Sequence, residues 1–209
     1  MRRTQKILSV ILAILMVLSI VPITASAAAT SGTCGDNLMW TYNTTTLTLT
    51  ISGTGDMKDY GMSNRPWESY EDKIKTVIIS DGVTSIGKYA FYSLGSVTSI
   101  SIPESVTKLG DRVFNACKLL TTVTLPQGLT TIPTSTFTNC SGLTSITIPE
   151  NVTSIGLSAF EGCSSLTSIT IPDGVTSIGD KAFASCKKLE GITIPANLTT
   201  ISNSAFDGC

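Results

Sequence analysis

Cysteine is the most reactive residue type in this chain, and five of its six cysteines recur at one fixed interval, the separation of Cys117 from Cys140. In a stacked repeat, side chains at one repeat position stand about 4.8 Å apart, the distance between neighbouring strands. Parallel side chains fit the torsion angle of a disulfide poorly, and a straight column does not converge on a metal ion. The spacing therefore predicts buried free thiols that pack as small apolar side chains. The five are Cys117, Cys140, Cys163, Cys186 and Cys209, whereas Cys34 stands apart without an assignable partner.

Catalytic chemistry has little support in the composition, because the chain contains no histidine. Histidine is the commonest general base and the commonest metal ligand. Adjacent carboxylates such as Glu71 and Asp72 would point in opposite directions on a strand, and they lie in a charged stretch typical of solvated surface. The sequence also lacks a phosphate-binding glycine loop and a nucleophile elbow. We therefore expect no enzymatic activity, no cofactor and no metal site.

Serine and threonine form two further columns with the same interval, at positions that alternate with an apolar residue. This alternation predicts that both hydroxyl columns lie on the exposed side of a strand. One interpretation is structural, since threonine is a good strand former and an uncharged column avoids like-charge repulsion. The other is functional: the hydroxyls form a hydrogen-bonding sheet for contact with a protein or a glycan, although few aromatic residues are present to stack on a sugar. The columns are Ser101, Thr124, Thr147, Thr170, Thr193 and Ser99, Thr122, Ser145, Ser168, Gly191. The candidate contact residues among them are Thr122, Thr124, Ser145, Thr147, Ser168, Thr170 and Thr193.

The elements that position these columns follow from the apolar residues, which keep the same interval. Phenylalanine returns at this interval from Phe91 to Phe206, proline does so from Pro103 to Pro195, and no insertion breaks the register after Ile74. A fixed period in this range is typical of a solenoid, in which each copy of one unit covers the next. The few apolar residues of one unit do not offset the entropy of ordering it, so a single coil should not fold alone.

The unit from Leu143 to Ser165 serves to assign the coil. Alternating polar and apolar residues predict a strand up to Ile148, and the following proline ends it because proline lacks the N–H that a ladder requires. A second apolar stretch, Val152–Ile155, forms the other side of the coil, and Gly156 is expected to take a positive φ at a corner. Ser158–Phe160 predicts a single helical or 3₁₀ turn that points the ring inward. The fold class is therefore a repeat solenoid whose coils each contain short β-strands and one such turn.

The pattern LxxIxIPxxVxxIGxxAFxxC resembles the bacterial-surface type of leucine-rich repeat, the BspA-like or Treponema-type repeat of about 23 residues. The resemblance covers residues 74–209 in about six units, with departures at Leu94, Pro133 and Thr136 that fall in corner and core positions. It implies leucine-rich-repeat coils in a secreted or cell-surface protein. It also implies partners such as host matrix proteins or other bacterial surfaces.

The segment 1–27 is typical of a secretory signal peptide. Arg2, Arg3 and Lys6 precede an apolar run, and Ala25-Ser26-Ala27 is a small-residue cleavage site. The apolar run of about 15 residues is short for a membrane-spanning helix, so we expect cleavage after Ala27 rather than a retained membrane anchor. Cleavage removes three of the 14 basic residues and none of the 15 acidic ones, which leaves a net charge of −4 and no basis for binding nucleic acid.

Residues 28–73 precede the repeat array and are expected to form a small β-rich cap that hides the edge of the first coil. Leu38–Tyr42 and Leu47–Ser52 predict two strands separated by a turn. Pro66 is well placed to open a short helical turn around Trp67. The segment also resembles the N-terminal region that precedes such repeats in secreted proteins of Gram-positive anaerobes.

The array itself spans residues 74–209 and stops at Cys209 with no strand after it. An uncovered solenoid edge is prone to aggregation, so this end favours a piece of a longer protein over a last coil that frays.

Two functions of different class remain open. The first is a non-catalytic extracellular binding or adhesion module that uses the solenoid surface for contact with a protein or a glycan. The second is a structural spacer or envelope component that presents a further C-terminal domain. Regular threonine columns would also suit an ice-binding face. Curvature of the solenoid and the serine and glycine residues that interrupt the columns count against this function. An enzyme would need an activity that works without histidine.

Overall fold

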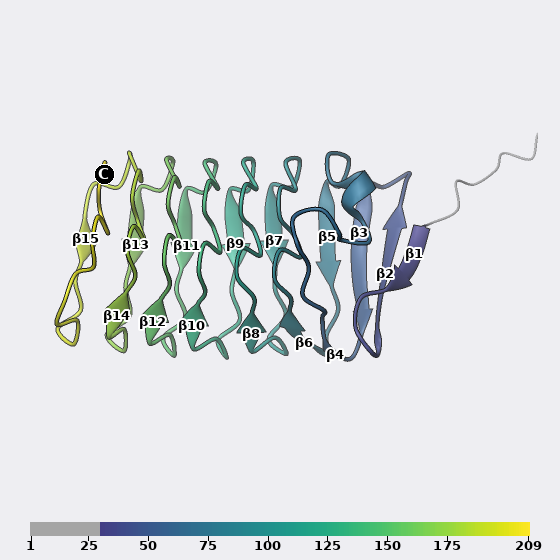
Figure 1. Cartoon of the computed structure of the whole chain (residues 1–209), viewed down its shortest axis with the longest axis horizontal. Coiled ribbons are helices and arrows are strands. Elements are labelled where there is room, and N and C mark those ends of the chain that lie inside the picture. Colours follow the sequence, from purple (N-terminus) through teal and green to yellow (C-terminus); the bar gives the residue numbers. More distant parts are fainter. Residues whose placement is uncertain (1–29) are drawn as a thin grey trace, which may run out of the picture.

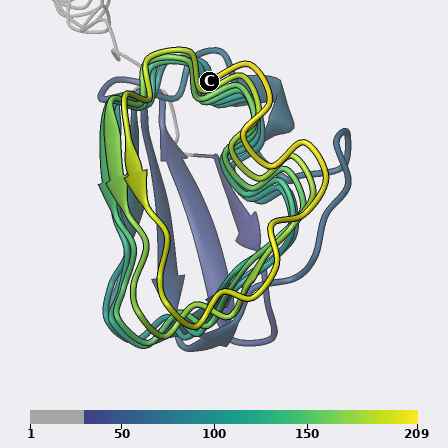
Figure 2. The same ribbon diagram turned by 90° about the vertical axis from the view of Figure 1, so that its left-hand side faces the viewer.

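Stacked coils form a nearly straight β-solenoid in the computed structural model, which describes residues 30–209 (Figure 1). The predicted signal peptide lies outside the described residues. Figure 2, which looks along the stack, shows the coils superposed on one another with a column of strands along one side. The predicted repeat solenoid is confirmed.

Each coil up to residue 178 contributes a first strand and a second strand, and most of these strands pair in parallel with the equivalent strand of a neighbouring coil. Equivalent residues lie opposite each other, such as Ile146 and Ile169, so the strand register equals the sequence interval. The first strands are β5 (Thr76–Ile79), β7 (Ser99–Ser101), β9 (Thr122–Thr124), β11 (Ser145–Thr147), β13 (Ser168–Thr170) and β15 (Ile192–Thr193). The second strands are β6 (Val83–Ile86), β8 (Lys108–Leu109), β10 (Thr131–Ile132), β12 (Ser154–Ile155) and β14 (Ser177–Ile178). As predicted, β11 ends before Pro149.

A continuous apolar core runs along the inside of the stack, and the phenylalanines form a column within it. From Phe91 to Phe206, successive rings stack with centroids 5.2–5.8 Å apart and interplanar angles of 4–16°. Every ring from Phe91 to Phe183 is fully buried, and Phe206 in the last described coil is half-buried. Stacked aromatic pairs contribute about 0.5–1.5 kcal/mol beyond the burial of their area, so the column stabilises the contact between every pair of coils.

The third side of each coil is a run of tight turns, not the helical or 3₁₀ turn that the sequence predicted. Ser158 and Gly162 have φ angles of 53° and 74°, and left-handed residues interrupt a right-handed helix. The N–H groups of Ser158, Phe160 and Gly162 donate to carbonyls of the next coil at 2.9, 2.7 and 2.8 Å. Alternate N–H groups therefore link the coils on this side as well, while those between them bond within their own coil.

Gly156 lacks the positive φ that the sequence predicted, because the left-handed conformation falls two residues later, at Ser158. Glycine is required at this position by a close approach between coils. A Cβ on Gly156 would lie 2.7 Å from the amide nitrogen of Thr134 and 2.8 Å from the carbonyl carbon of Pro133, both in the preceding coil.

The cap segment is a hairpin whose second strand begins the stack. As predicted, β2 (Leu38–Asn43) and β3 (Thr48–Gly53) form an antiparallel pair. β1 (Thr30–Thr33), which the sequence did not indicate, pairs with the outer side of β2. β3 then pairs in parallel with β5, and β4 (Gly55–Asp56) pairs in parallel with β6, so the cap presents both strand columns to the first coil.

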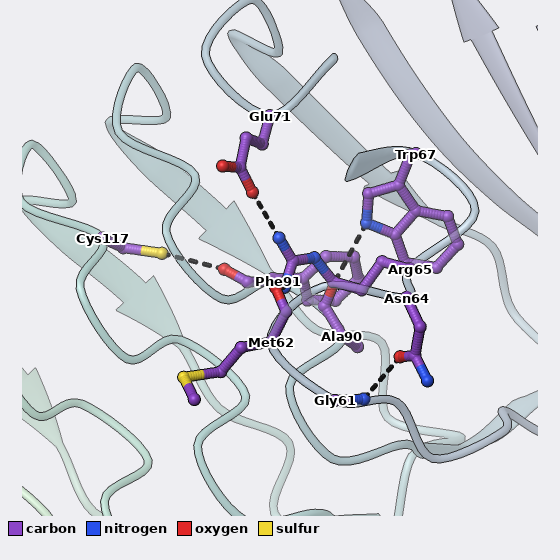
Figure 3. Close-up of polar contacts among 9 residues, drawn as sticks. All are labelled: Gly61, Met62, Asn64, Arg65, Trp67, Glu71, Ala90, Phe91 and Cys117. Atoms are coloured by element: carbon purple, nitrogen blue, oxygen red, sulfur yellow. Dashed lines mark hydrogen bonds and ion pairs between the residues drawn. The ribbon is translucent and has the colours of Figure 1, made fainter. Parts of the chain in front are cut away.

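Trp67 continues the aromatic column into the cap, directly before the 3₁₀ helix η1 (Glu68–Tyr70) that matches the predicted helical turn. Its buried ring lies 6.3 Å from that of Phe91. Its indole N–H donates to the carbonyl of Ala90 at 3.0 Å (Figure 3). Farther along the stack the equivalent carbonyl accepts from a backbone N–H instead, as Val113 does from Phe91. The indole therefore takes the place of a backbone donor at the first coil.

The cysteine column lies beside the phenylalanines, and its thiols are free, as predicted. Each Sγ donates a hydrogen bond to a phenylalanine carbonyl of the preceding coil at 3.1–3.2 Å, so these thiols are more than small apolar side chains. Burial raises the pKa of Cys117 and of Cys186 to about 12. The prediction of burial is wrong for Cys209, which is exposed because none of the described coils covers it.

We expect Phe160→Ala to lower the free energy of unfolding by about 3–5 kcal/mol, because it removes a fully buried ring that stacks on both neighbouring rings. Leu157→Ala is the control, since the Leu157 side chain is 47% exposed and its loss should change stability by about 0.5 kcal/mol or less. Urea unfolding followed by circular dichroism measures both variants. Equal effects of the two substitutions would contradict a phenylalanine column in the core.

Alanine substitutions at two glycines, one at a close approach between coils and one in open space, test the packing of the coils. Gly156→Ala should destabilise the protein by about 1–3 kcal/mol, because the added methyl group overlaps backbone atoms of the preceding coil. Gly191→Ala should be neutral or stabilise by up to about 1 kcal/mol, because no atom lies within 4 Å of its Cβ position. Thermal unfolding of both variants is the measurement, and a tolerated alanine at Gly156 would refute the close approach.

Thiol alkylation tests the cysteine column. At pH 8, iodoacetamide should modify Cys209 in the native protein and the other five thiols only after denaturation, because those five are buried. Burial also raises the pKa of each of them, that of Cys34 to about 11, so little thiolate forms at this pH. Mass spectrometry of digested protein locates the label, and native Cys209→Ser should take up none. Native modification of Cys140 or Cys163 at the rate of Cys209 would contradict the buried column.

Candidate functional site

The hydroxyl columns lie on the exposed side of the first strands, where the sequence placed them. In each strand two hydroxyl residues flank an inward-pointing apolar residue, as Ser145 and Thr147 flank buried Ile146. All seven candidate contact residues are exposed: Thr122, Thr124, Ser145, Thr147, Ser168, Thr170 and Thr193. Together with the exposed Ser99 and Ser101 of β7, these residues are called the hydroxyl face.

Strand pairing turns the hydroxyl face into a regular grid. Thr147 lies opposite Thr170, and Thr170 lies opposite Thr193, so one column continues unbroken from strand to strand. The second column pairs Ser145 with Ser168 in the same way. Neighbouring strands stand about 4.8 Å apart, and alternate residues along a strand about 6.7 Å apart. The face therefore presents hydroxyl groups at these two fixed spacings.

The hydroxyls of this face are not used inside the protein. Within residues 30–209, no side chain of the hydroxyl face makes an intramolecular hydrogen bond, whereas the column directly beside it does. Thr121, Thr144 and Thr167 each donate from Oγ1 to a threonine carbonyl of the preceding coil, at 2.9–3.5 Å. The hydroxyl groups of the face are thus left to bond water or a partner.

The face is nearly flat and uncharged, and charged residues of both signs border it, with exposed Lys118, Lys187 and Lys188 before the first strands. The phenylalanine rings recur every 5.2–5.8 Å, little more than the strand spacing of about 4.8 Å, so successive coils are only slightly splayed. Glu104, Glu150 and Asp173 are exposed where the chain turns after the first strand. The weak curvature removes one objection to an ice-binding face, while the serine and glycine interruptions remain.

The hydroxyl columns continue toward the cap, which sequence reasoning missed. Thr48 and Thr50 of β3 lie opposite Thr76 and Ile78 of β5. The offset from Thr48 to Thr76 is longer than the repeat interval, so a search at that interval does not find it. The alternation in β3 was the available signal. Ile78, 49% exposed, interrupts the hydroxyls at this point.

A buried arginine in the cap was also not predicted. Arg65 is 3% exposed, forms an ion pair with Glu71, and donates to the carbonyl of Met62 at 2.8 Å (Figure 3). Its guanidinium lies 5.3 Å from the ring centroid of Tyr92 in the first coil. These contacts fasten the loop before Trp67 to the array. They also correct the prediction that Glu71 belongs to solvated surface, because it balances a buried charge.

Other kinds of site find no support in the part of the chain that the structure describes. No group of cysteine and carboxylate side chains within it is placed to hold a metal ion. None of its helices is long and apolar enough to cross a membrane. What this part of the chain presents is an extended polar surface.

Comparison with known proteins agrees with this architecture. The family described as BspA type leucine rich repeat region, with six copies of the repeat, matches residues 69–190 and again residues 153–209. No curated protein sequence matches the chain.

Solved structures give the same result at the level of fold. A leucine-rich repeat protein from Bacteroides ovatus is similar with a TM-score of 0.61 and 31% identity, over 84% of this chain and 44% of that protein. The leucine rich repeat protein of T. pallidum is similar with a TM-score of 0.63 and 27% identity, over 81% of this chain and 74% of that protein. A leucine rich cell surface protein from Faecalibacterium prausnitzii is similar with a TM-score of 0.52 and 28% identity, over 81% of this chain and 55% of that protein. This chain therefore spans less than half the length of the Bacteroides protein that it matches. Since the family match extends over most of the sequence, the chain belongs to the BspA type leucine-rich repeat family.

Proposed function

We propose that the protein is an extracellular binding module without catalytic activity, and that the hydroxyl face is its contact surface for a protein or a glycan. The observation that carries the proposal is the set of exposed hydroxyl groups, aligned on a nearly flat face, that make no hydrogen bond within the described protein. Strand propensity accounts for threonine at these positions. It does not account for a face left unbonded beside a column whose hydroxyls are bonded to the preceding coil.

The chemistry of the face indicates how it would bind. A neutral hydrogen bond contributes about 0.5–1.5 kcal/mol net, so one coil binds weakly and affinity has to come from several coils acting together. An extended partner, either a protein segment or a polysaccharide, can span the five strands from β7 to β15. Because the contacts are uncharged, binding should depend little on salt concentration.

Export and a surface location belong to the same proposal. They are supported by the signal-peptide pattern of the segment 1–27 and by similarity to a leucine rich cell surface protein. Host matrix proteins and other bacterial surfaces are the partners that the family resemblance favours. The alternative role is a spacer that presents another domain, for which the straight stack of similar coils is equally suited.

Binding of the chain from Ala28 to Cys209 to an immobilised panel of matrix proteins, mucins and polysaccharides tests the proposal. We expect saturable binding that changes little between low and high salt. The quadruple variant Thr124→Lys, Thr147→Lys, Thr170→Lys, Thr193→Lys should lose this binding, because four charges and four long side chains then cover one column of the face.

A matched variant separates the face from general charge effects. Thr131→Lys, Ser177→Lys, Thr199→Lys and Thr200→Lys add the same charge at exposed positions off the hydroxyl face, and this variant should bind like the unmodified protein. Equal loss in both variants would reject the face as the contact surface. Absence of binding to every member of the panel would favour the spacer.

A further inference from the structure

A second surface, next to the cap, differs in kind from the hydroxyl face. Tyr89 and Tyr92 lie on the turn side of the first coil, half-buried, with their rings edge to face at 5.7 Å. Met62 is 59% exposed, and its carbonyl accepts from the same Arg65 guanidinium that lies over Tyr92. The five tyrosines of the chain divide between this surface and the cap interior, where the rings of Tyr42 and Tyr70 stack at 4.4 Å.

Arg112 completes this surface from the next coil. Its guanidinium lies 5.6 Å from the ring centroid of Tyr89. Among the described residues, the ion pairs are Arg65 with Glu71 and Lys88 with Asp59, so Arg112 forms no ion pair with them. Its side chain donates no hydrogen bond to any described residue either. A cation is thus held against an aromatic ring, half-buried, with its hydrogen-bond donors unused.

The repeat shows that these residues are not a requirement of the fold. Tyr89 and Arg112 occupy one repeat position, at which every residue has a positive φ between 53° and 58°. The other coils have Ser135, Ser158, Lys181 and Ser204 at this position. A bulky aromatic side chain is unusual in the left-handed conformation. Three other coils have the small residue serine at this position. Only the two coils next to the cap place an aromatic ring and a guanidinium together there.

We propose that Tyr89, Tyr92 and Arg112, called the tyrosine–arginine patch, form a second contact surface that binds an acidic segment of a partner protein. Arginine binds carboxylate through two parallel hydrogen bonds, and tyrosine and arginine are among the residue types that most often carry the binding energy of protein interfaces. The surface goes beyond the proposed function, because it lies off the hydroxyl face and recognises charge.

A protein partner fits this patch better than a glycan does. A sugar ring stacks on a free aromatic face, but a guanidinium lies over one face of each tyrosine, and the two rings meet edge to face. The groups left to a partner are therefore the phenol hydroxyls, the ring edges and the charge of Arg112. A glutamate or aspartate with an aromatic or aliphatic neighbour uses all three.

An array of short synthetic peptides, with acidic and aromatic residues varied in position, is the probe for this surface. The full chain should bind peptides that combine a carboxylate with an aromatic residue, and glutamine in place of glutamate should abolish binding. Calorimetry on the best peptide should show affinity lowered about tenfold or more by Arg112→Ser and by Tyr89→Ser. Both substitutions introduce the residue that other coils already carry in the same conformation, so the fold should be kept.

Lys181→Ser is the matched control, since it removes a cation from the same repeat position far from the cap, and it should leave peptide affinity unchanged. The quadruple lysine variant of the hydroxyl face should also bind the peptide normally, so failure of one surface is distinguishable from failure of the other. Absence of peptide binding, or unchanged affinity in Arg112→Ser, would overturn the proposal. Binding of a uronic-acid oligosaccharide that needs Arg112, without peptide binding, would overturn it in favour of a glycan.

Discussion

Hydrogen bonding between coils at one fixed offset is the constraint on which the rest of this structure depends. All three sides of a coil, namely both strands and the tight turns, bond to neighbouring coils at an offset equal or close to the repeat interval. A single inserted residue would place these donors opposite the wrong acceptors and turn each strand residue to the other face. The phenylalanine column, the thiol column and the hydroxyl face are consequences of that offset, because equal spacing in sequence becomes alignment in space.

Sequence reasoning succeeded where a property depends on the period and failed where it depends on backbone angles or on contacts that do not repeat. Alternation around Ile146 is enough to place Ser145 and Thr147 on the surface. It does not reveal that Ser158 rather than Gly156 is left-handed, because serine, unlike glycine, does not favour the left-handed conformation. Nor does it show that the Thr121 hydroxyl donates a hydrogen bond to a carbonyl while the hydroxyl of the adjacent Thr122 does not. That difference depends on the direction in which each side chain points.

The cap solves a problem that the repeat creates. The first coil needs a neighbour that supplies strand partners and a donor for the carbonyl of Ala90, yet that neighbour must not require another coil before it. β3 and β4 supply the strand partners, the indole of Trp67 supplies the donor, and Arg65 with Glu71 fastens the connecting loop. These contacts are singular rather than periodic, which explains why the sequence pattern located the cap but missed its arginine.

The sameness of the coils has a consequence for whatever rests on the hydroxyl face. A partner that bridges two adjacent strands from β7 to β15 meets nearly the same pattern after a shift of one coil, at about four successive positions. This multiplicity favours association by about 0.8 kcal/mol, from RT ln 4, and leaves no position strongly preferred. In the proposed binding role, such a partner would be held at a defined orientation but would move in steps of about 4.8 Å. The hydroxyl face would then act as a track, along which a bound chain slides without first having to dissociate.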